Sequence, residues 1–201
     1  MIHKGDVIEN PITGETMVFL QTTEDTGGDL LQIDLFVAPG GGVNGEHSHP
    51  GQTERLRVRR GEMTLEVDGR RTVLGPRDEA VIPPGASHIW WNSAGSELNA
   101  IVELSPAGRY TPVLSTFFGL ARAGQVDEQG LPPLLQTSLT LREYRDTVVM
   151  TNISPAVRDY ALPVLALVGR LLGLRPEYPY PRRSRVNQGM EIWRSEELTA
   201  A

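Results

Sequence analysis

Residues 41–61 decide the fold, and they read GGVNGEHSHPGQTERLRVRRG. His47 and His49 are two positions apart, so on a strand both imidazoles project from the same face. Glu54 follows His49 by five positions, which is the wrong parity for one continuous strand. The Pro50-Gly51 pair between them predicts a corner. A corner lets the carboxylate of Glu54 come round to the face that carries both imidazoles.

The strand that follows this corner is predicted to have one apolar face and one basic face. Leu56 and Val58 share the face of Glu54, as expected for an interior, and are candidate substrate-binding residues. The opposite face either is exposed to solvent or pairs with acidic side chains of a second subunit. It carries a stripe of arginines, namely Arg55, Arg57, Arg59 and the adjoining Arg60.

A second segment, residues 78–92, reads DEAVIPPGASHIWWN. His88 follows the turn residues Pro83-Pro84-Gly85 and is predicted to begin a strand, with Trp90 and Asn92 on the same face. Trp90 is either a wall of a substrate site or a core residue. Asn92 is either a hydrogen-bonding group beside the site or a strand-end residue. Both are candidate substrate-binding residues.

These two segments resemble the two sequence motifs of the cupin family. The first motif is matched by Gly41, His47, His49, Glu54 and Gly61, and the second by Pro83, Gly85, His88 and Asn92. The segment departs from the family once, because Arg77 stands where the family usually has glycine. That glycine serves a turn, so the departure concerns the local backbone and not the site.

The resemblance implies a mainly β protein, a double-stranded β-helix or jelly roll, with one divalent metal ion inside. In the family, the residues that match His47, His49, Glu54 and His88 are the metal ligands. Imidazole and carboxylate suit borderline divalent ions. Four protein ligands fit an octahedral ion with two open positions better than a zinc site, which favours Fe, Mn, Ni or Co over Zn.

Short alternating segments separated by Gly, Pro and Asp-Gly turns fill the chain before residue 106. This pattern is typical of an antiparallel sandwich or barrel, and Asp68-Gly69 is a strong hairpin signal. The predicted strands are Thr16–Gln21, Leu30–Val37, Glu54–Arg59, Met63–Val67, Arg71–Leu74, Glu79–Ile82, His88–Asn92 and Leu98–Leu104.

After residue 106 the apolar period lengthens to that of a helix. We expect three helices, Tyr110–Ala123, Pro132–Thr147 and Pro155–Leu172, the last capped by Ser154 and kinked or broken at Pro163. The chain is thus divided into a cupin barrel at 1–106, a helical extension at 107–175 and an extended arm or tail at 176–201. The extension is expected to pack on the barrel or on a partner in a homodimer, with a membrane-surface segment as the alternative.

Composition excludes several classes of protein. The chain has 201 residues, a formal net charge of −6 and no cysteine. Disulfides, zinc ribbons, iron–sulfur clusters and thiol nucleophiles are therefore excluded. An acidic chain is a poor general nucleic-acid binder, so no nucleic-acid partner is expected. We see no leader and no apolar stretch of about 20 residues, so we expect a cytoplasmic protein without a membrane span.

These features predict a metal-dependent enzyme that acts on a small organic molecule, with a dioxygenase-type oxidoreductase favoured by family analogy. One alternative is a non-redox isomerase, lyase or cyclase of secondary metabolism, with Glu54 as the catalytic base. The other is a small-molecule-binding cupin without turnover. Glu46, Glu103 and Tyr110 are candidate acid–base helpers if their side chains point inward.

Overall fold

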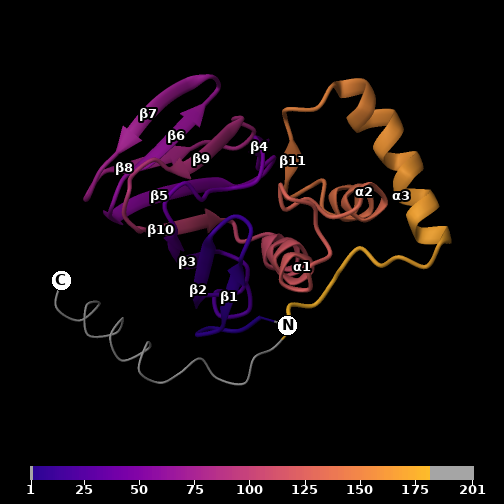
Figure 1. Cartoon of the computed structure of the whole chain (residues 1–201), viewed down its shortest axis with the longest axis horizontal. Coiled ribbons are helices and arrows are strands. Elements are labelled where there is room, and N and C mark those ends of the chain that lie inside the picture. Colours follow the sequence, from indigo (N-terminus) through magenta and orange to yellow (C-terminus); the bar gives the residue numbers. More distant parts are fainter. Residues whose placement is uncertain (1, 182–201) are drawn as a thin grey trace.

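The computed structural model describes residues 2–181 and shows a mainly β protein with three α-helices in its C-terminal half. Two antiparallel sheets face each other, and the helices extend away from one end of them (Figure 1). The predicted fold class, a jelly roll followed by about three helices, is confirmed. The predicted tail lies mostly at 182–201, outside the described residues.

The first sheet has six strands in the order β1-β2-β3-β10-β5-β8. The predicted strands in it are all present, and the structure adds β1, which has only four residues and no clear alternation. The bounds are β1 Val7–Asn10, β2 Glu15–Gln21, β3 Leu31–Val37, β5 Thr53–Arg60, β8 Glu79–Ile82 and β10 Leu98–Ser105.

The second sheet has five strands in the order β11-β4-β9-β6-β7. Its outermost strand, β11, comes from beyond the second helix and pairs with the short β4. The C-terminal extension therefore completes this sheet. The bounds are β4 His47–Ser48, β6 Met63–Val67, β7 Arg70–Leu74, β9 His88–Asn92 and β11 Val149–Met150.

The hydrophobic core lies between the two sheets. Leu56 and Val58 on β5 are buried in it, as the alternation predicts. The outward face of β5 carries the arginine stripe, and three of its members lie near acids of the same chain. Arg55 pairs with Glu79, and Arg60 lies 2.8 Å from Glu97. Pairing with a second subunit is therefore not needed to neutralise these two arginines.

Glycines of the first motif stand where the backbone requires them. Gly61 has φ of +80°, and an added Cβ would lie 2.8 Å from the carbonyl oxygen of Glu97. At Gly41 an added Cβ would lie 2.4 Å from the carbonyl oxygen of Thr13. The glycine at 41 thus lets the segment before β4 pass directly against the turn between β1 and β2.

Both predicted turns take left-handed backbone conformations. Asp68 and Gly69 have φ of 47° and 75°, which suits a two-residue hairpin between β6 and β7. Arg77 has φ of 77° even though it is not glycine. Its amide donates to the carbonyl of Val58 at 2.9 Å. The turn that the family makes with glycine is therefore kept.

The three helices are shorter than predicted. α1 spans Tyr110–Arg122, α2 spans Leu134–Glu143 and α3 spans Leu162–Leu171. A π-helical segment at Val157–Ala161 leads directly into α3, so Pro163 is accommodated by a wider helical turn rather than by a break. Ser154 caps this segment as expected, because its hydroxyl accepts from the amide of Val157 at 3.4 Å.

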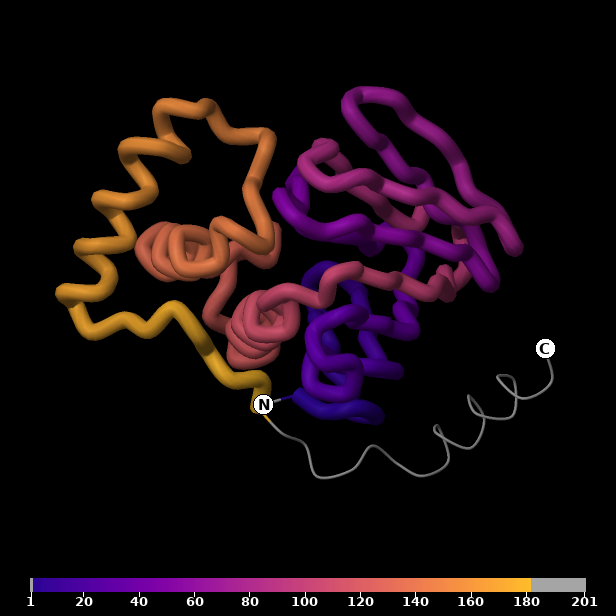
Figure 2. Tube along the Cα trace, turned by 180° about the vertical axis from the view of Figure 1, so that it is seen from behind, coloured from indigo at the N-terminus to yellow at the C-terminus, as the bar shows by residue number. Residues whose placement is uncertain are grey.

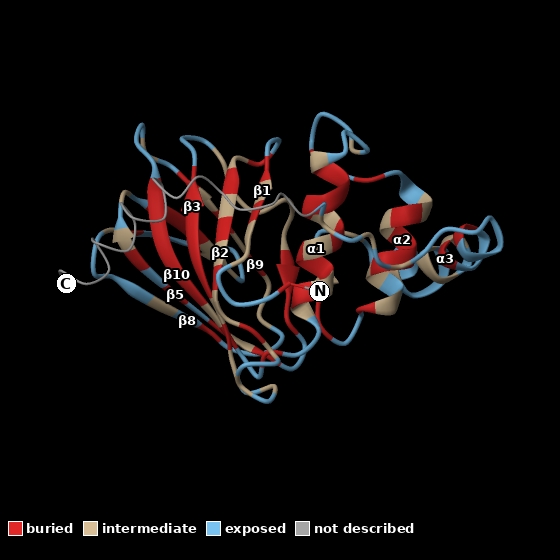
Figure 3. Ribbon diagram, turned by 90° about the horizontal axis from the view of Figure 1, so that it is seen from below, coloured by how far each residue is buried: buried red, intermediate tan, exposed pale blue. Residues whose placement is uncertain are grey.

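The helices are arranged one beyond another from the sheets outward. α1 packs beside β1, and α3 packs on α2 rather than on the sheets (Figures 1 and 2). Residues 175–181 then return along α1 to β1, where the hydroxyl of Tyr180 accepts from the amide of Glu9 at 3.0 Å. α3 exposes much of its surface (Figure 3). Within the described residues, none of the helices is long and apolar enough to cross a bilayer.

Candidate metal centre and adjoining cavity

Four buried side chains from both sheets converge on one point. His47 lies on β4, His49 directly after it, Glu54 on β5 and His88 on β9. β4 and β9 place His47 opposite His88, and the Pro50-Gly51 corner carries the chain from the second sheet to the first. One nitrogen or oxygen of each side chain lies within 4.8 Å of the others. The change of sheet is what brings Glu54 to the imidazoles.

Each imidazole is oriented by a backbone carbonyl. Nδ1 of His47 donates to Gly45 at 3.0 Å, Nδ1 of His88 donates to Ala86 at 3.0 Å, and Nδ1 of His49 donates to Thr147 at 2.9 Å. A donor at Nδ1 leaves the lone pair of a neutral imidazole on Nε2. The three rings are thus held with Nε2 available as a ligand atom.

Three of the atoms that could bind a metal have no hydrogen-bond partner in the protein. Oε2 of Glu54 lies 2.7 Å from Nε2 of His88 and 3.5 Å from Nε2 of His49. These three atoms are fully buried, and none makes a hydrogen bond of normal geometry in the described structure. Buried polar atoms are normally satisfied, so an unsatisfied group of three needs another binding partner.

Burial and mutual contact set the protonation of the group. Burial, with the imidazoles of His88 and His49, lowers the pKa of His47 to about 3. Burial would raise the pKa of Glu54, but the two imidazoles beside it lower it overall. Burial likewise opposes protonation of His88, while contact with Glu54 raises its pKa overall. A neutral His47 and an ionised Glu54 are the protonation states that metal ligation requires.

A cavity of about 130 Å³ adjoins the four side chains. His47 and Glu54 reach its wall, together with Trp90 and Tyr110. Most of the remaining wall is apolar, and the helical extension supplies part of it. The lining residues from the extension are Val113, Leu114, Phe117, Phe118, Gly130, Leu131, Thr137, Leu141, Val148 and Met150. The C-terminal helices therefore help to close the cavity.

Comparison with protein families gives a match over residues 35–102, described as a cupin domain. The match covers about a third of the chain and contains all four converging residues. The protein contains a cupin domain. In this domain the His-His-Glu-His cluster is compatible with a metal ion, since three imidazoles and a carboxylate converge there and Nε2 of His49, Nε2 of His88 and Oε2 of Glu54 have no hydrogen-bond partner.

Two curated relatives match part of the cupin domain. One is an oxidoreductase of Arthrobotrys oligospora, 33% identical over 63 residues, or 31% of this chain and 25% of that protein. The other is the oxidoreductase macE of Penicillium terrestre, 36% identical over 56 residues, or 27% of this chain and 22% of that protein. The chain thus matches about a quarter of the length of these relatives.

Solved structures also resemble the cupin domain. A predicted oxalate decarboxylase from Thermotoga maritima gives a TM-score of 0.46 at 22% identity, covering 53% of this chain and 99% of that one. KdgF from Halomonas sp. gives a TM-score of 0.44 at 22% identity, covering 50% of this chain and 87% of that one. Likenesses of this strength carry no conclusion about the reaction.

The candidate substrate-binding residues occupy different places. Trp90 lines the cavity, while its neighbour Trp91 faces outward beneath the guanidinium of Arg71. The amide of Asn92 donates to the carbonyls of Val37 and Ser96, at 2.9 and 2.8 Å. Leu56 and Val58 lie in the core. The structure brings Trp90 to the cupin cavity and leaves the other three outside its lining.

Of the three candidate acid–base helpers, only Tyr110 reaches the cavity. Its ring packs edge-on against His49, with centroids 4.9 Å apart, and burial raises the pKa of its hydroxyl. Glu46 accepts a hydrogen bond from Ser87, and Glu103 accepts one from Gln32. Glu46 and Glu103 are not part of the cavity wall.

Sequence reasoning missed several polar residues of the cavity wall, among them Asn10 and Glu15. Both are buried. The sequence did carry a signal for Glu15. It lies two and four residues before Met17 and Phe19, so all three side chains are on the same, inward face of β2. A carboxylate in register with buried apolar residues is unusual and marks a candidate site.

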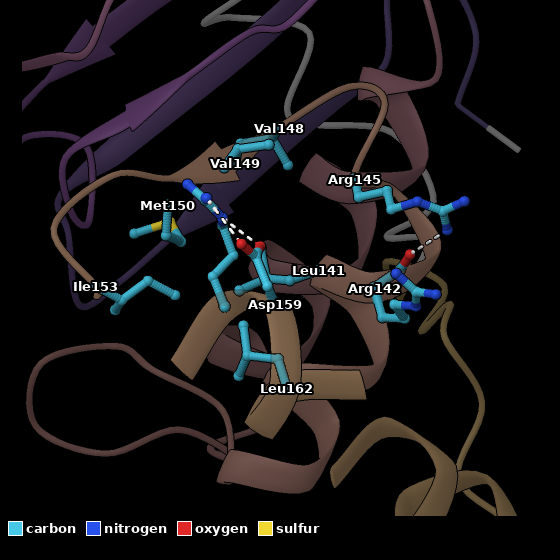
Figure 4. A pocket seen from close by; sticks show the side chains of 10 residues that line it. Leu141, Arg142, Arg145, Val148, Val149, Met150, Ile153, Asp159 and Leu162 are labelled. Atoms are coloured by element: carbon cyan, nitrogen blue, oxygen red, sulfur yellow. Dashed lines mark hydrogen bonds and ion pairs between the residues drawn. The ribbon is translucent and has the colours of Figure 1, made fainter. Parts of the chain in front are cut away.

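An outer groove of about 450 Å³ lies beyond the cavity, between α2, β11 and the π-helical segment. Met150 and Ile153 lie on one side of it, and Arg142 and Arg145 on the other (Figure 4). Leu141, Val148 and Met150 line both the groove and the inner cavity. These three side chains therefore form the partition between the two spaces.

Proposed function

We propose that this protein is a metal-dependent cupin enzyme that acts on a small organic molecule, with the chemistry of a dioxygenase-type oxidoreductase. One observation carries the proposal. Three oriented imidazoles and an ionised carboxylate converge beside a largely apolar cavity, and three of their buried atoms have no hydrogen-bond partner. A cluster of titratable groups beside a largely apolar cavity is the usual arrangement of an enzyme site.

His47, His49, Glu54 and His88 would hold the metal, with Nε2 of each histidine as the ligand atom. The four-ligand set of nitrogen and oxygen favours Fe, Mn, Ni or Co over Zn. A bound divalent ion would polarise a substrate oxygen or activate dioxygen. The lowered pKa of Glu54 keeps its carboxylate ionised, which suits a ligand better than a catalytic base.

The residues around this centre orient and shield a substrate. Trp90 and Tyr110 flank the ligands, and the apolar side chains of α1 exclude water from the space next to them. The two matched relatives named as oxidoreductases support a redox reaction.

A non-redox isomerase, lyase or cyclase is the second candidate, and Glu15 is the observation that favours it. Burial raises the pKa of this carboxyl to about 8, although a hydrogen bond from Thr13 opposes the shift. A carboxyl of this pKa in the cavity wall can hold or release a proton near neutral pH. Binding without turnover is the remaining alternative.

The test is to purify the protein without added metal, measure its metal content, and follow oxygen uptake with phenols, flavonoids and diketones. We expect about one equivalent of a transition metal in the wild type and in His3→Ala, and almost none in His88→Ala. His3 is the matched control, because it is the histidine outside the cluster.

The outcomes separate the candidates. Oxygen uptake in the wild type and in His3→Ala, but not in His88→Ala, supports the oxidoreductase. Bound metal without oxygen uptake favours the non-redox or binding function. A wild type without metal, or full activity in His88→Ala, would contradict the proposed enzyme.

We also propose that the chain forms a homodimer. The support is the outward face of α3, where Val164, Leu167 and Leu171 are 62%, 58% and 79% exposed. Apolar side chains gathered on one exposed helix face often mark an interface. A cytoplasmic location and the lack of a nucleic-acid partner stay predictions from composition.

A further inference from the structure

A second polar feature lies in the cavity wall, apart from the four converging ligands. Asn10 and Glu15 are opposite each other in the β1–β2 pair, at the end next to the turn. Their side chains line the cavity and are only 5% and 4% exposed. Two polar side chains thus stand side by side in a wall that is otherwise largely apolar.

The turn fixes the amide of Asn10 in one orientation. Its Oδ1 accepts from the backbone amides of Ile12 and Thr13, at 3.1 and 3.3 Å. Because Oδ1 is used in this way, Nδ2 is the group directed away from the turn. Nδ2 has no hydrogen-bond partner among residues 2–181. Asn10 thus has an amide donor without a protein partner among the described residues, on a side chain that lines the cavity.

Glu15, the cross-strand partner of Asn10, also has a side-chain oxygen without a partner. Its Oε2 accepts from the hydroxyl of Thr13 at 2.6 Å, and the described structure provides Oε1 with no partner. Burial raises the pKa of this carboxyl to about 8 despite the hydrogen bond from Thr13. At neutral pH the group is therefore mainly uncharged, and it can accept or donate a hydrogen bond.

The fold does not need these unused groups. The turn uses only Oδ1 of Asn10, and an apolar side chain at position 15 would match its inward neighbours Met17 and Phe19. Polar atoms that line a cavity and have no protein partner are available to pair with a ligand that enters it. An unused donor beside an unused oxygen matches a hydroxyl group, which both accepts and donates.

The remaining wall defines the rest of the ligand. Apart from the four proposed metal ligands, the lining contains no lysine or arginine among the described residues, so an anionic group at the Asn10 and Glu15 end would find no cationic side chain there. Its apolar members include Met17, Ile33 and Val102. The volume of about 130 Å³ is close to that of an apolar cavity, about 150 Å³, which accepts benzene in another protein. A single ring therefore fits.

We propose that Asn10 and Glu15 form a substrate-binding subsite that receives a hydroxyl group of an uncharged, otherwise apolar, single-ring molecule. This inference rests on the proposed function in one respect, because it takes the occupant of the cavity to be the substrate. The hydroxyl accepts from Nδ2 of Asn10 and pairs with Oε1 of Glu15. The ring contacts the apolar wall.

The test compares the binding of phenol and toluene, which have nearly the same shape and differ by a hydroxyl in place of a methyl group. The ratio of the two dissociation constants is measured by NMR titration in the wild type and in four variants. Glu15→Leu removes the oxygens. Asn10→Asp removes the donor but keeps the oxygen that the turn uses. Glu15→Gln keeps the shape and the polarity, and Met17→Leu changes only the apolar wall.

We expect the wild type to prefer phenol, and Glu15→Leu and Asn10→Asp each to lower that preference about tenfold. Glu15→Gln should stay within about threefold of the wild type, and Met17→Leu should affect both probes alike. Circular dichroism checks that each variant is folded. If Glu15→Leu does not fold, Asn10→Asp and Glu15→Gln decide the question.

An unchanged preference in the variants that remove a polar partner would overturn the subsite, and so would equal losses for both probes. Binding of neither probe to the wild type would overturn it as well. The same titration in His88→Ala, with metal content measured in each preparation, keeps the two proposals apart. The phenol preference should persist there, so a failure of metal binding and a failure of the subsite give different results.

Discussion

Arg77 shows how one residue departs from a family motif without changing the site. It occupies the position where cupins usually have glycine, and its φ of 77° lies in the left-handed region that favours glycine. Hydrogen bonds on both sides hold the turn, since the amide of Asp78 donates to Gly75 and the amide of Gly75 donates to the Asp78 carboxylate. The backbone conformation is kept, although it is sterically less favourable for arginine than for glycine.

We therefore expect Arg77→Gly to raise the free energy of unfolding, by up to about 1 kcal/mol, because glycine adopts this conformation without steric strain. Urea unfolding in the presence of a chelator measures the change independently of metal. Arg70→Gly is the control, since Arg70 lies at the start of strand β7. There glycine should lower stability by a similar amount. A loss of stability in Arg77→Gly would contradict the strain argument.

At the scale of elements, β11 links the helical extension to the candidate metal centre. Its two residues pair with β4, with Met150 opposite His47. The carbonyl of Thr147, two residues before β11, accepts from Nδ1 of His49. The amide of Thr151, directly after it, donates to the carbonyl of Glu46 at 3.0 Å. The extension thus orients one of the four converging side chains.

Thr151→Pro should weaken metal binding, because proline cannot make the hydrogen bond that holds β11 to the segment before His47. We expect the affinity for Ni²⁺ or Mn²⁺ to fall about tenfold, as is typical when a residue that orients a metal ligand is lost. Competition with a chromophoric chelator gives the affinity. Thr151→Ala removes only the hydroxyl and should bind nearly as the wild type. Equal affinity in both variants would show that β11 is not needed to orient His49.

At the scale of the whole molecule, α3 lies on the side of α2 away from the sheets and exposes apolar residues along one face. Leu167 and Leu171 are 58% and 79% exposed and lie one turn apart on that face. A second copy of the chain would cover them in the proposed homodimer.

We expect the double variant Leu167→Glu/Leu171→Glu to be monomeric at concentrations where the wild type is dimeric, because charged groups are costly to bury in an apolar interface. Light scattering coupled to size-exclusion chromatography measures the mass. Val73→Glu, which places a charge at a residue 57% exposed on β7, should leave the dimer intact. A monomeric wild type would contradict the dimer, and a dimeric double variant would place the interface elsewhere.

Much of the fold could be predicted from local pattern. Alternation predicted the paired strands β5, β9 and β10, because one face of each is buried. β1 and β11 were missed, because four and two residues are too short to show a period. The second helix was predicted too long, because residues 144–147 form turns after α2 rather than a further helical turn.

Strand alternation in the sequence predicted an antiparallel sandwich or barrel, and strand parity with the Pro50-Gly51 corner brought His47, His49 and Glu54 to one face. The jelly roll and the addition of His88 to the set came from the resemblance to the cupin motifs. Only the tertiary structure decided what surrounds them. The Thr147 carbonyl reaches His49 across 98 positions of sequence, and α1 closes a cavity whose polar wall comes from β1 and β2. Contacts between such distant segments depend on how the whole chain packs, and no periodicity within a segment encodes them.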